Sequence, residues 1–92
     1  MFTEQQLKES AEFKEWVTPE NVVLIHNCYY DSKEPYGSYI VISKEDDDNP
    51  SLYTITRFFQ GGNNINVSVD YQDVTAEEIF PLLLSDYSGG LA

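Results

Sequence analysis

The stretch Asn64-Ile65-Asn66-Val67-Ser68-Val69-Asp70-Tyr71 alternates polar and apolar residues without a break. Successive side chains of a β-strand point to opposite faces, so this two-residue period predicts a strand over residues 64–71. Ile65, Val67, Val69 and Tyr71 are expected on a core and the polar residues in water. A sheet with one wet face is typical of antiparallel pairing, so the stretch indicates an antiparallel sheet.

Three further runs of strand-forming residues precede this stretch, over residues 22–30, 39–42 and 52–59. The first is apolar at both parities over Val22–Ile25, which predicts a strand covered on both faces, as a central strand would be. Turn-forming segments separate the runs, and the last of them is Gly61-Gly62. Short connections between four successive strands favour an antiparallel meander.

Helical patterns flank the four strands. Residues 3–17 are predicted to form an amphipathic helix that starts with a capping box of Thr3 and Gln6. A second helix start, with Thr75 and Glu78, is followed by Pro81, which predicts a kink or two short turns across residues 76–87.

The predicted fold class is α+β. It is a two-layer sandwich of a four-stranded antiparallel meander, with an N-terminal helix and a short, Pro-interrupted C-terminal helix free to cover one face. Residues 1–87 are expected to form a single domain and residues 88–92 a flexible C-terminal tail.

The charge balance is the strongest global feature. The 92 residues carry 16 Asp and Glu against 5 Lys and Arg, for a formal net charge of −11. This charge opposes direct binding to nucleic acid or to an anionic membrane and favours a basic protein partner. Its magnitude exceeds the value of about 2–8 that suits a soluble small domain.

Four consecutive carboxylates, Glu45-Asp46-Asp47-Asp48, lie between the second and third predicted strands. Asn49-Pro50-Ser51 already supplies the turn formers, so the turn does not require the charges. The predicted partner-binding residues are Glu45, Asp46, Asp47, Asp48, Glu34 and Tyr36, the last two from the preceding strand connection.

Two interpretations of the acidic residues stay open. The charges can serve solubility alone. Alternatively, carboxylates repeated at strand spacing, or at helix spacing as in Glu9, Glu12 and Glu15, resemble a phosphate backbone in spacing and sign.

No motif in the sequence indicates catalytic, cofactor or metal chemistry. His26 and Cys28 are the single residues of their types, and packing in an apolar strand accounts for both. An EF-hand loop starting at Asp47 would place Leu52 at the glycine position and Phe58 at the final glutamate position, so the spacing fails. We therefore expect a protein without enzymatic activity, cofactor or metal.

The environment expected from the sequence is the cytoplasm. The N-terminus lacks the pattern of a signal peptide, and no apolar run approaches the roughly 20 residues of a membrane span. A single cysteine cannot form an internal disulfide. No membrane association is expected.

Two functions from different classes fit these features. The first is a small acidic inhibitor or antagonist that presents carboxylates and tyrosines to a basic site on a larger protein, such as the nucleic-acid-binding groove of an enzyme. Phage counter-defence proteins (anti-CRISPR and anti-restriction inhibitors) and nuclease immunity proteins are of this kind. The second is a non-enzymatic adaptor or self-associating module, a homodimer included, that binds through an apolar sheet face or an edge strand.

Overall fold

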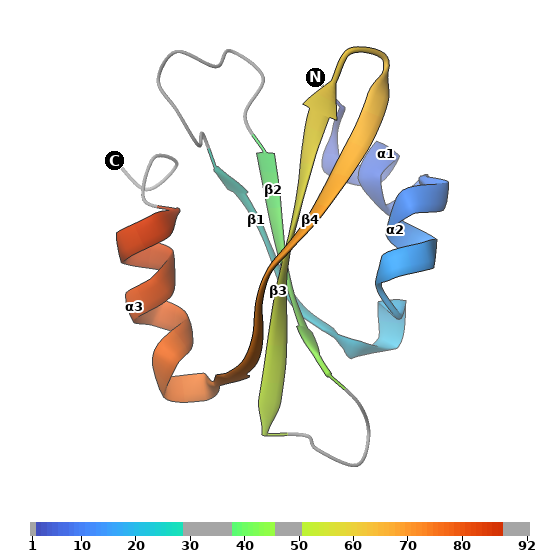
Figure 1. The fold of residues 1–92 in the computed structure, drawn as a ribbon. Helices are drawn as coiled ribbons and strands as arrows, with labels where there is room; N and C mark the ends of the chain where they lie inside the picture. Colours follow the sequence, from blue (N-terminus) through green and yellow to red (C-terminus); the bar gives the residue numbers. More distant parts are fainter. Residues whose placement is uncertain (1, 29–37, 46–50, 88–92) are drawn as a thin grey trace.

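The structure is a computed structural model that describes residues 2–28, 38–45 and 51–87. The elements are α1 (Glu4–Glu9), α2 (Ala11–Trp16), the 3-10 turn η1 (Pro19–Asn21), β1 (Val22–Cys28), β2 (Ser38–Lys44), β3 (Leu52–Gly61), β4 (Asn64–Thr75) and α3 (Ala76–Asp86). The strands form one antiparallel sheet in the order β1-β2-β3-β4 (Figure 1). The predicted α+β class, the meander and the helices at both ends of it are confirmed. The expected tail, residues 88–92, lies outside the described residues.

Strand β2 is buried on both faces along residues 38–43. Its side chains divide between two hydrophobic clusters: Tyr39 and Val41 join one, and Ile40 and Ile42 join the other. Because neighbouring strand residues point to opposite faces, the two clusters lie on opposite faces of the sheet.

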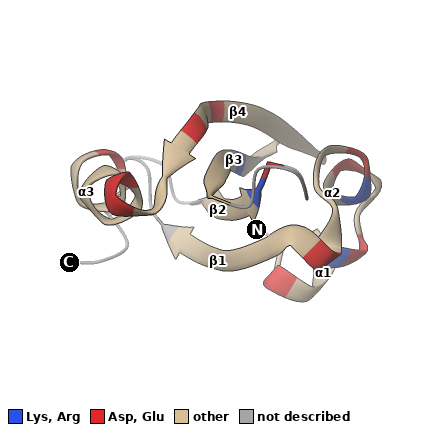
Figure 2. Ribbon diagram, turned by 90° about the horizontal axis from the view of Figure 1, so that it is seen from below, with Lys and Arg blue, Asp and Glu red and all other residues tan. Residues whose placement is uncertain are grey.

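The helices therefore cover opposite faces. The cluster with Val41 also contains Leu7 of α1 and Phe13 of α2, whereas the cluster with Ile42 receives Leu82 and Leu83 of α3. Figures 1 and 2 show α1 and α2 on one side of the sheet and α3 on the other. The arrangement differs from the expected two layers with both helices on one face: it has three layers, because a strand that is apolar at each of residues 39–42 needs cover on both faces.

Strand β1 lies at an edge of the sheet and not at its centre, where its apolar start had placed it. Val23 and Leu24 are 53% and 43% exposed, and the pairing with β2 is irregular between Val22 and Leu24. The inner positions belong to β2 and β3.

The helix predicted over residues 3–17 is divided at Ser10. The Thr3–Gln6 capping box is present, but Ser10 adopts an extended backbone and starts a second helix. Its hydroxyl accepts from the Phe13 N–H at 3.1 Å and donates to the Leu7 carbonyl at 2.6 Å. Leu7 and Phe13 would lie about 120° apart on one continuous helix, and the break lets both side chains enter the same cluster.

Helix α3 continues from Ala76 to Asp86 with Pro81 inside it, so the predicted pair of short turns does not occur. Pro81 itself is exposed, while Ile79, Leu82 and Leu83 pack against the cluster on the sheet. The backbone N–H of Tyr87 closes the helix on the Leu83 carbonyl at 3.1 Å. A proline removes one intrahelical donor, and this helix accommodates that loss on its solvent side.

Strand β4 keeps the predicted alternation only as far as Val69. Thr56 pairs with Val69 and Ile55 pairs with Tyr71, so Asp70 is an extra residue in β4. Ile65 and Val67 pack toward α1 and α2 as expected, but Tyr71 packs toward α3. Such a bulge turns two consecutive side chains to one face.

Candidate functional site

The meander brings several acidic segments to one end of the sheet. Strand β1 begins there, β2 ends there, and β4 passes into α3 there, as the pairs Val22–Ser43 and Leu52–Thr75 show. The described acidic residues at this end are Glu20, Glu45, Asp73, Glu77 and Glu78, and we call this set the acidic end. Figure 2 views the molecule from this side and shows acidic segments on α3 and β4.

Glu45 is the member of the predicted acidic run that the structure describes. Its Oε1 accepts hydrogen bonds from the Asp73 N–H at 2.6 Å and from the Thr54 hydroxyl at 3.2 Å. Its own N–H donates to the Leu52 carbonyl at 3.1 Å. Glu45 therefore fastens the start of the acidic run to β3 and β4.

Asp73 meets Glu45 at this point. Asp73 adopts a left-handed backbone with φ of 55°, a conformation that Asp tolerates better than most residues. Hydrogen bonding to Glu45, together with the negative charge of Glu45, raises the pKa of the Asp73 carboxyl. Two carboxyl groups thus adjoin the point where the acidic run begins, which increases the local negative charge.

The first turn of α3 adds Glu77 and Glu78, both exposed. The Thr75 hydroxyl donates to Glu78 Oε1 at 2.9 Å, which holds this carboxylate beside the start of the helix. Carboxylates are favourable at a helix N-terminus because the peptide dipoles place partial positive charge there. The helix start can therefore carry this negative charge at little cost to the fold.

The predicted site residues belong to two different strand connections. Asp46, Asp47, Asp48, Glu34 and Tyr36 lie outside the described residues. The segment with Glu34 and Tyr36 joins the end of β1 to the start of β2, and the acidic run joins the end of β2 to the start of β3. These strand ends are at opposite ends of the sheet (Figure 1).

Sequence reasoning did not include Glu20, Asp73, Glu77 and Glu78 in the site. Counting strand directions could have found them, because in a four-stranded meander the entry to the first strand and the exit from the fourth share an end with the second connection. The alternative row of Glu9, Glu12 and Glu15 assumed one helix. Glu9 belongs to α1 and the other two to α2, so the break at Ser10 interrupts the row.

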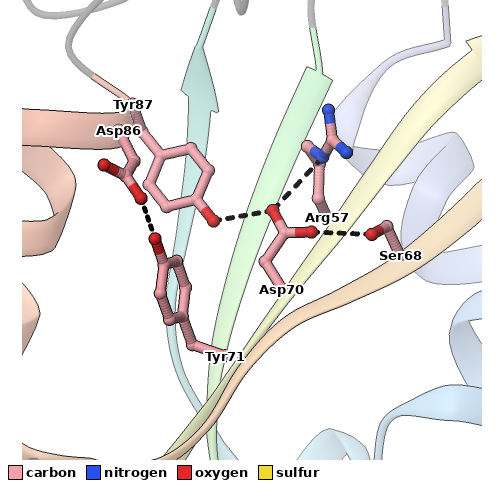
Figure 3. A network of polar contacts seen from close by, with 6 residues as sticks. All are labelled: Arg57, Ser68, Asp70, Tyr71, Asp86 and Tyr87. Carbon is pink, nitrogen blue, oxygen red and sulfur yellow. Dashed lines mark hydrogen bonds and ion pairs between the residues drawn. The ribbon is translucent and has the colours of Figure 1, made fainter.

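A polar network attaches α3 to the sheet (Figure 3). The Asp70 carboxylate accepts from the Tyr87 hydroxyl at 2.7 Å and the Ser68 hydroxyl at 2.6 Å, and it lies 3.3 Å from Arg57 Nε. The Tyr71 hydroxyl donates to Asp86. Arg57 also lies over the Phe59 ring, 5.0 Å from its centroid. Because Asp70 already has three partners, this network serves the fold and is not the candidate partner site.

Burial contributes to the strength of this network. Tyr87 is 2% exposed, and this burial, with the hydrogen bond to Asp70, raises the pKa of its phenol. The hydroxyl therefore stays protonated and donates a hydrogen bond to Asp70 across the ordinary pH range.

Within the described ranges, no three His, Cys, Asp or Glu side chains are grouped so that they could hold a metal ion. In the same part of the chain, no helix has the length and apolar character needed to cross a membrane. Comparison with protein-family models, with curated proteins and with solved structures found no match to this chain.

Proposed function

We propose that this protein is a small, non-catalytic inhibitor or antagonist that acts in the cytoplasm by presenting its acidic end to a basic site on a larger protein. The observation that carries the proposal is the convergence of Glu20, Glu45, Asp73, Glu77 and Glu78 on the sheet end where the run Asp46–Asp48 begins. The net charge of −11 adds a long-range field of the same sign.

The partner that suits this surface is a nucleic-acid-binding enzyme. Its groove carries cations that normally meet phosphates, and carboxylates offer the same sign of charge. Electrostatic attraction would speed the encounter and make it sensitive to salt. Anti-CRISPR and anti-restriction proteins of phages, and immunity proteins against nuclease toxins, are the kinds of antagonist that we propose.

The test uses two variants that each lose three negative charges. One carries Asp46→Asn, Asp47→Asn and Asp48→Asn, and the control carries Glu9→Gln, Glu12→Gln and Glu15→Gln. The wild-type chain first captures a partner from its host, and that partner is then tested for binding to a DNA or RNA duplex in competition with each form of the protein.

The proposal expects the wild type to displace the nucleic acid, and it expects the loop variant to do so at least about tenfold more weakly than the helix variant. If both variants displace the nucleic acid equally weakly, the effect comes from net charge and not from the loop. A captured partner that binds no nucleic acid would contradict the proposed class of antagonist.

A second candidate function rests on the β1 edge. Residues 22–28 of this edge strand carry no Asp, Glu, Lys or Arg, and Val23 and Leu24 are exposed. The opposite edge, β4, contains Asp70, Asp73 and two register shifts, which disfavour pairing with another strand. Since helices cover both sheet faces in the described part of the chain, the β1 edge and not a sheet face is the part of the sheet suited to self-association.

This second candidate predicts a homodimer in which β1 pairs with β1 of another copy. Light scattering over a concentration series measures the mass, and Leu24→Lys places a charge on the edge. A dimer that Leu24→Lys returns to a monomer supports the pairing. A monomeric mass at every concentration contradicts it.

A further inference from the structure

A pocket of about 220 Å³ opens beside the acidic end, between the end of α2 and the sheet. Its lining includes Trp16 from α2 and Ser43, Glu45, Thr54, Thr56 and Val69 from the sheet region. The pocket lies on the same sheet face as α1 and α2, because Val41 of that face pairs with Thr56.

Trp16 forms one wall of the pocket and is 55% exposed. Val69, which is also exposed, lines the same hollow. Tryptophan combines a large apolar ring with an electron-rich face and is enriched where protein partners bind most tightly. An exposed tryptophan that lines a pocket therefore indicates a binding site more strongly than one on a flat surface.

The floor of the pocket is polar. Ser43 pairs with Thr54, and both face the α1–α2 side together with Thr56. Ser43 and Thr56 are buried, although the same face a few residues further along carries Tyr39 and Phe58 in its apolar cluster. The hydroxyl oxygens of these three residues are hydrogen-bond acceptors of the kind that a charged donor group can use.

Two charged residues, Glu45 and Lys44, border the pocket. The Glu45 carboxylate borders the pocket and is oriented by the Thr54 hydroxyl. Lys44 also borders it, but Lys44 pairs with Tyr53, whose ring packs toward α3, so strand alternation directs the lysine side chain to the other face.

We propose that this pocket receives an arginine side chain of the basic partner. The guanidinium plane would stack on the Trp16 ring while its N–H groups donate to Glu45 and to the hydroxyls of the floor. Arginine suits the pocket better than lysine because its five donors lie in one plane and its weakly hydrated head stacks on aromatic rings. The inference rests on the proposed function and adds the residue type that the partner contributes.

The test exploits the fact that the chain contains one tryptophan. The indole N–H resonance of Trp16 is followed by NMR while the full chain is titrated with the peptide acetyl-Gly-Arg-Gly-amide. A matched peptide carries citrulline, which keeps the shape of arginine and lacks its charge. We expect a saturable shift with the arginine peptide and binding at least about fivefold weaker with the citrulline peptide.

Two charge-matched variants locate the binding. Glu45→Gln keeps a hydrogen-bond acceptor beside Asp73 and removes the pocket charge, so it should weaken the arginine peptide by about threefold or more. Glu15→Gln makes the same change one residue from Trp16 in an exposed side chain and should leave the affinity within about twofold. Trp16→Ala, followed through the Thr56 amide, should also weaken the peptide about threefold or more.

Equal shifts with the arginine and citrulline peptides, or equal effects of Glu45→Gln and Glu15→Gln, would overturn the inference. The two proposals fail separately. If the arginine peptide binds no better than the citrulline peptide but the partner still depends on Asp46–Asp48, the arginine pocket is rejected and the proposed function stands. A partner indifferent to Asp46–Asp48, with the peptide result intact, rejects the proposed function.

Discussion

At the scale of single residues, the hydroxyl of Tyr87 is the contact that most directly holds α3 on the sheet. The hydroxyl donates a hydrogen bond to the half-buried Asp70 carboxylate, and the Tyr87 side chain is almost fully buried. Tyr87→Phe removes this donor and keeps the ring, so we expect the free energy of unfolding to fall by about 1–2 kcal/mol. Urea denaturation followed by Trp16 fluorescence measures the change.

Tyr71→Phe is the matched control for this prediction. It removes a hydroxyl that contacts Asp86, which is exposed at the end of α3, so it should cost less than about 0.5 kcal/mol. An equal loss in both variants would contradict the special role of Tyr87.

The pair of Glu45 and Asp73 makes a prediction that depends on pH. The folded state raises the pKa of Asp73 above its ordinary value near 3.8, so it favours the neutral form. The contribution of Asp73 to stability is therefore fully present below pH 3.8 and is lost as the pH rises through the folded pKa. Asp73→Asn removes the charge and keeps a residue that tolerates the left-handed backbone, so it should raise the melting temperature at pH 7.

The melting temperatures of Asp73→Asn and the wild type, measured from pH 3 to pH 7, check this account. The difference should vanish below about pH 3.8, where Asp73 is protonated in both states. Glu15→Gln removes the same charge from an exposed position on α2 and controls for net charge. An advantage of Asp73→Asn that is no larger than that of Glu15→Gln at pH 7 would show that Glu45 does not act on Asp73.

At the scale of secondary-structure elements, Ser10 decides whether the N-terminal segment is one helix or two. Its hydroxyl caps α2 and also binds the last turn of α1. Ser10→Ala should lower the free energy of unfolding by about 1 kcal/mol, as the loss of an N-cap does. Ser85→Ala, an exposed serine near the end of α3, should change it by less than about 0.5 kcal/mol. Thermal denaturation of both variants measures the difference. A Ser10→Ala variant as stable as the wild type would show that the Ser10 hydroxyl does not stabilise the break between α1 and α2.

Most elements could be predicted from the sequence because their signals are local. The alternation over residues 64–69 and the Thr3–Gln6 capping box depend on residues only a few positions apart in the sequence. The layer arrangement could not be predicted in this way, since it depends on which strand becomes central. Val22–Ile25 and Tyr39–Ile42 are both apolar at both parities, and only the pairing order puts β2 inside the sheet and β1 at its edge.

The candidate site was predicted only in part for a similar reason. The run of carboxylates is visible as composition, but Asp73 and Glu45 lie 28 residues apart and meet only through the pairing of β2 with β3 and of β3 with β4. The bulge that turns both Asp70 and Tyr71 toward α3 also interrupts an alternation that the sequence shows as perfect. The contacts of the candidate site therefore depend on long-range strand pairing, which a local sequence pattern does not show.

At the scale of the whole molecule, the net charge of −11 should make stability depend on salt. Repulsion among carboxylates that are exposed on α1, α2, α3 and β4 opposes the compact state, and salt screens it. Raising NaCl from about 0.02 M to 0.5 M should increase the free energy of unfolding by about 1 kcal/mol, which is about 4–8 °C in the melting temperature of a chain this size. A melting temperature that falls over this range would show that attractive ion pairs outweigh the repulsion.

The central claim is that negative charge gathered at one end of the sheet is what a basic partner binds. The most direct test is the slope of the partner's dissociation constant against salt concentration, measured for the wild type and for the variant with Asp46→Asn, Asp47→Asn and Asp48→Asn. We predict that the wild type loses affinity steeply with salt and that the slope becomes clearly shallower in the variant, while Glu9→Gln, Glu12→Gln and Glu15→Gln together leave it nearly unchanged. Identical slopes in the wild type and the loop variant would contradict the account.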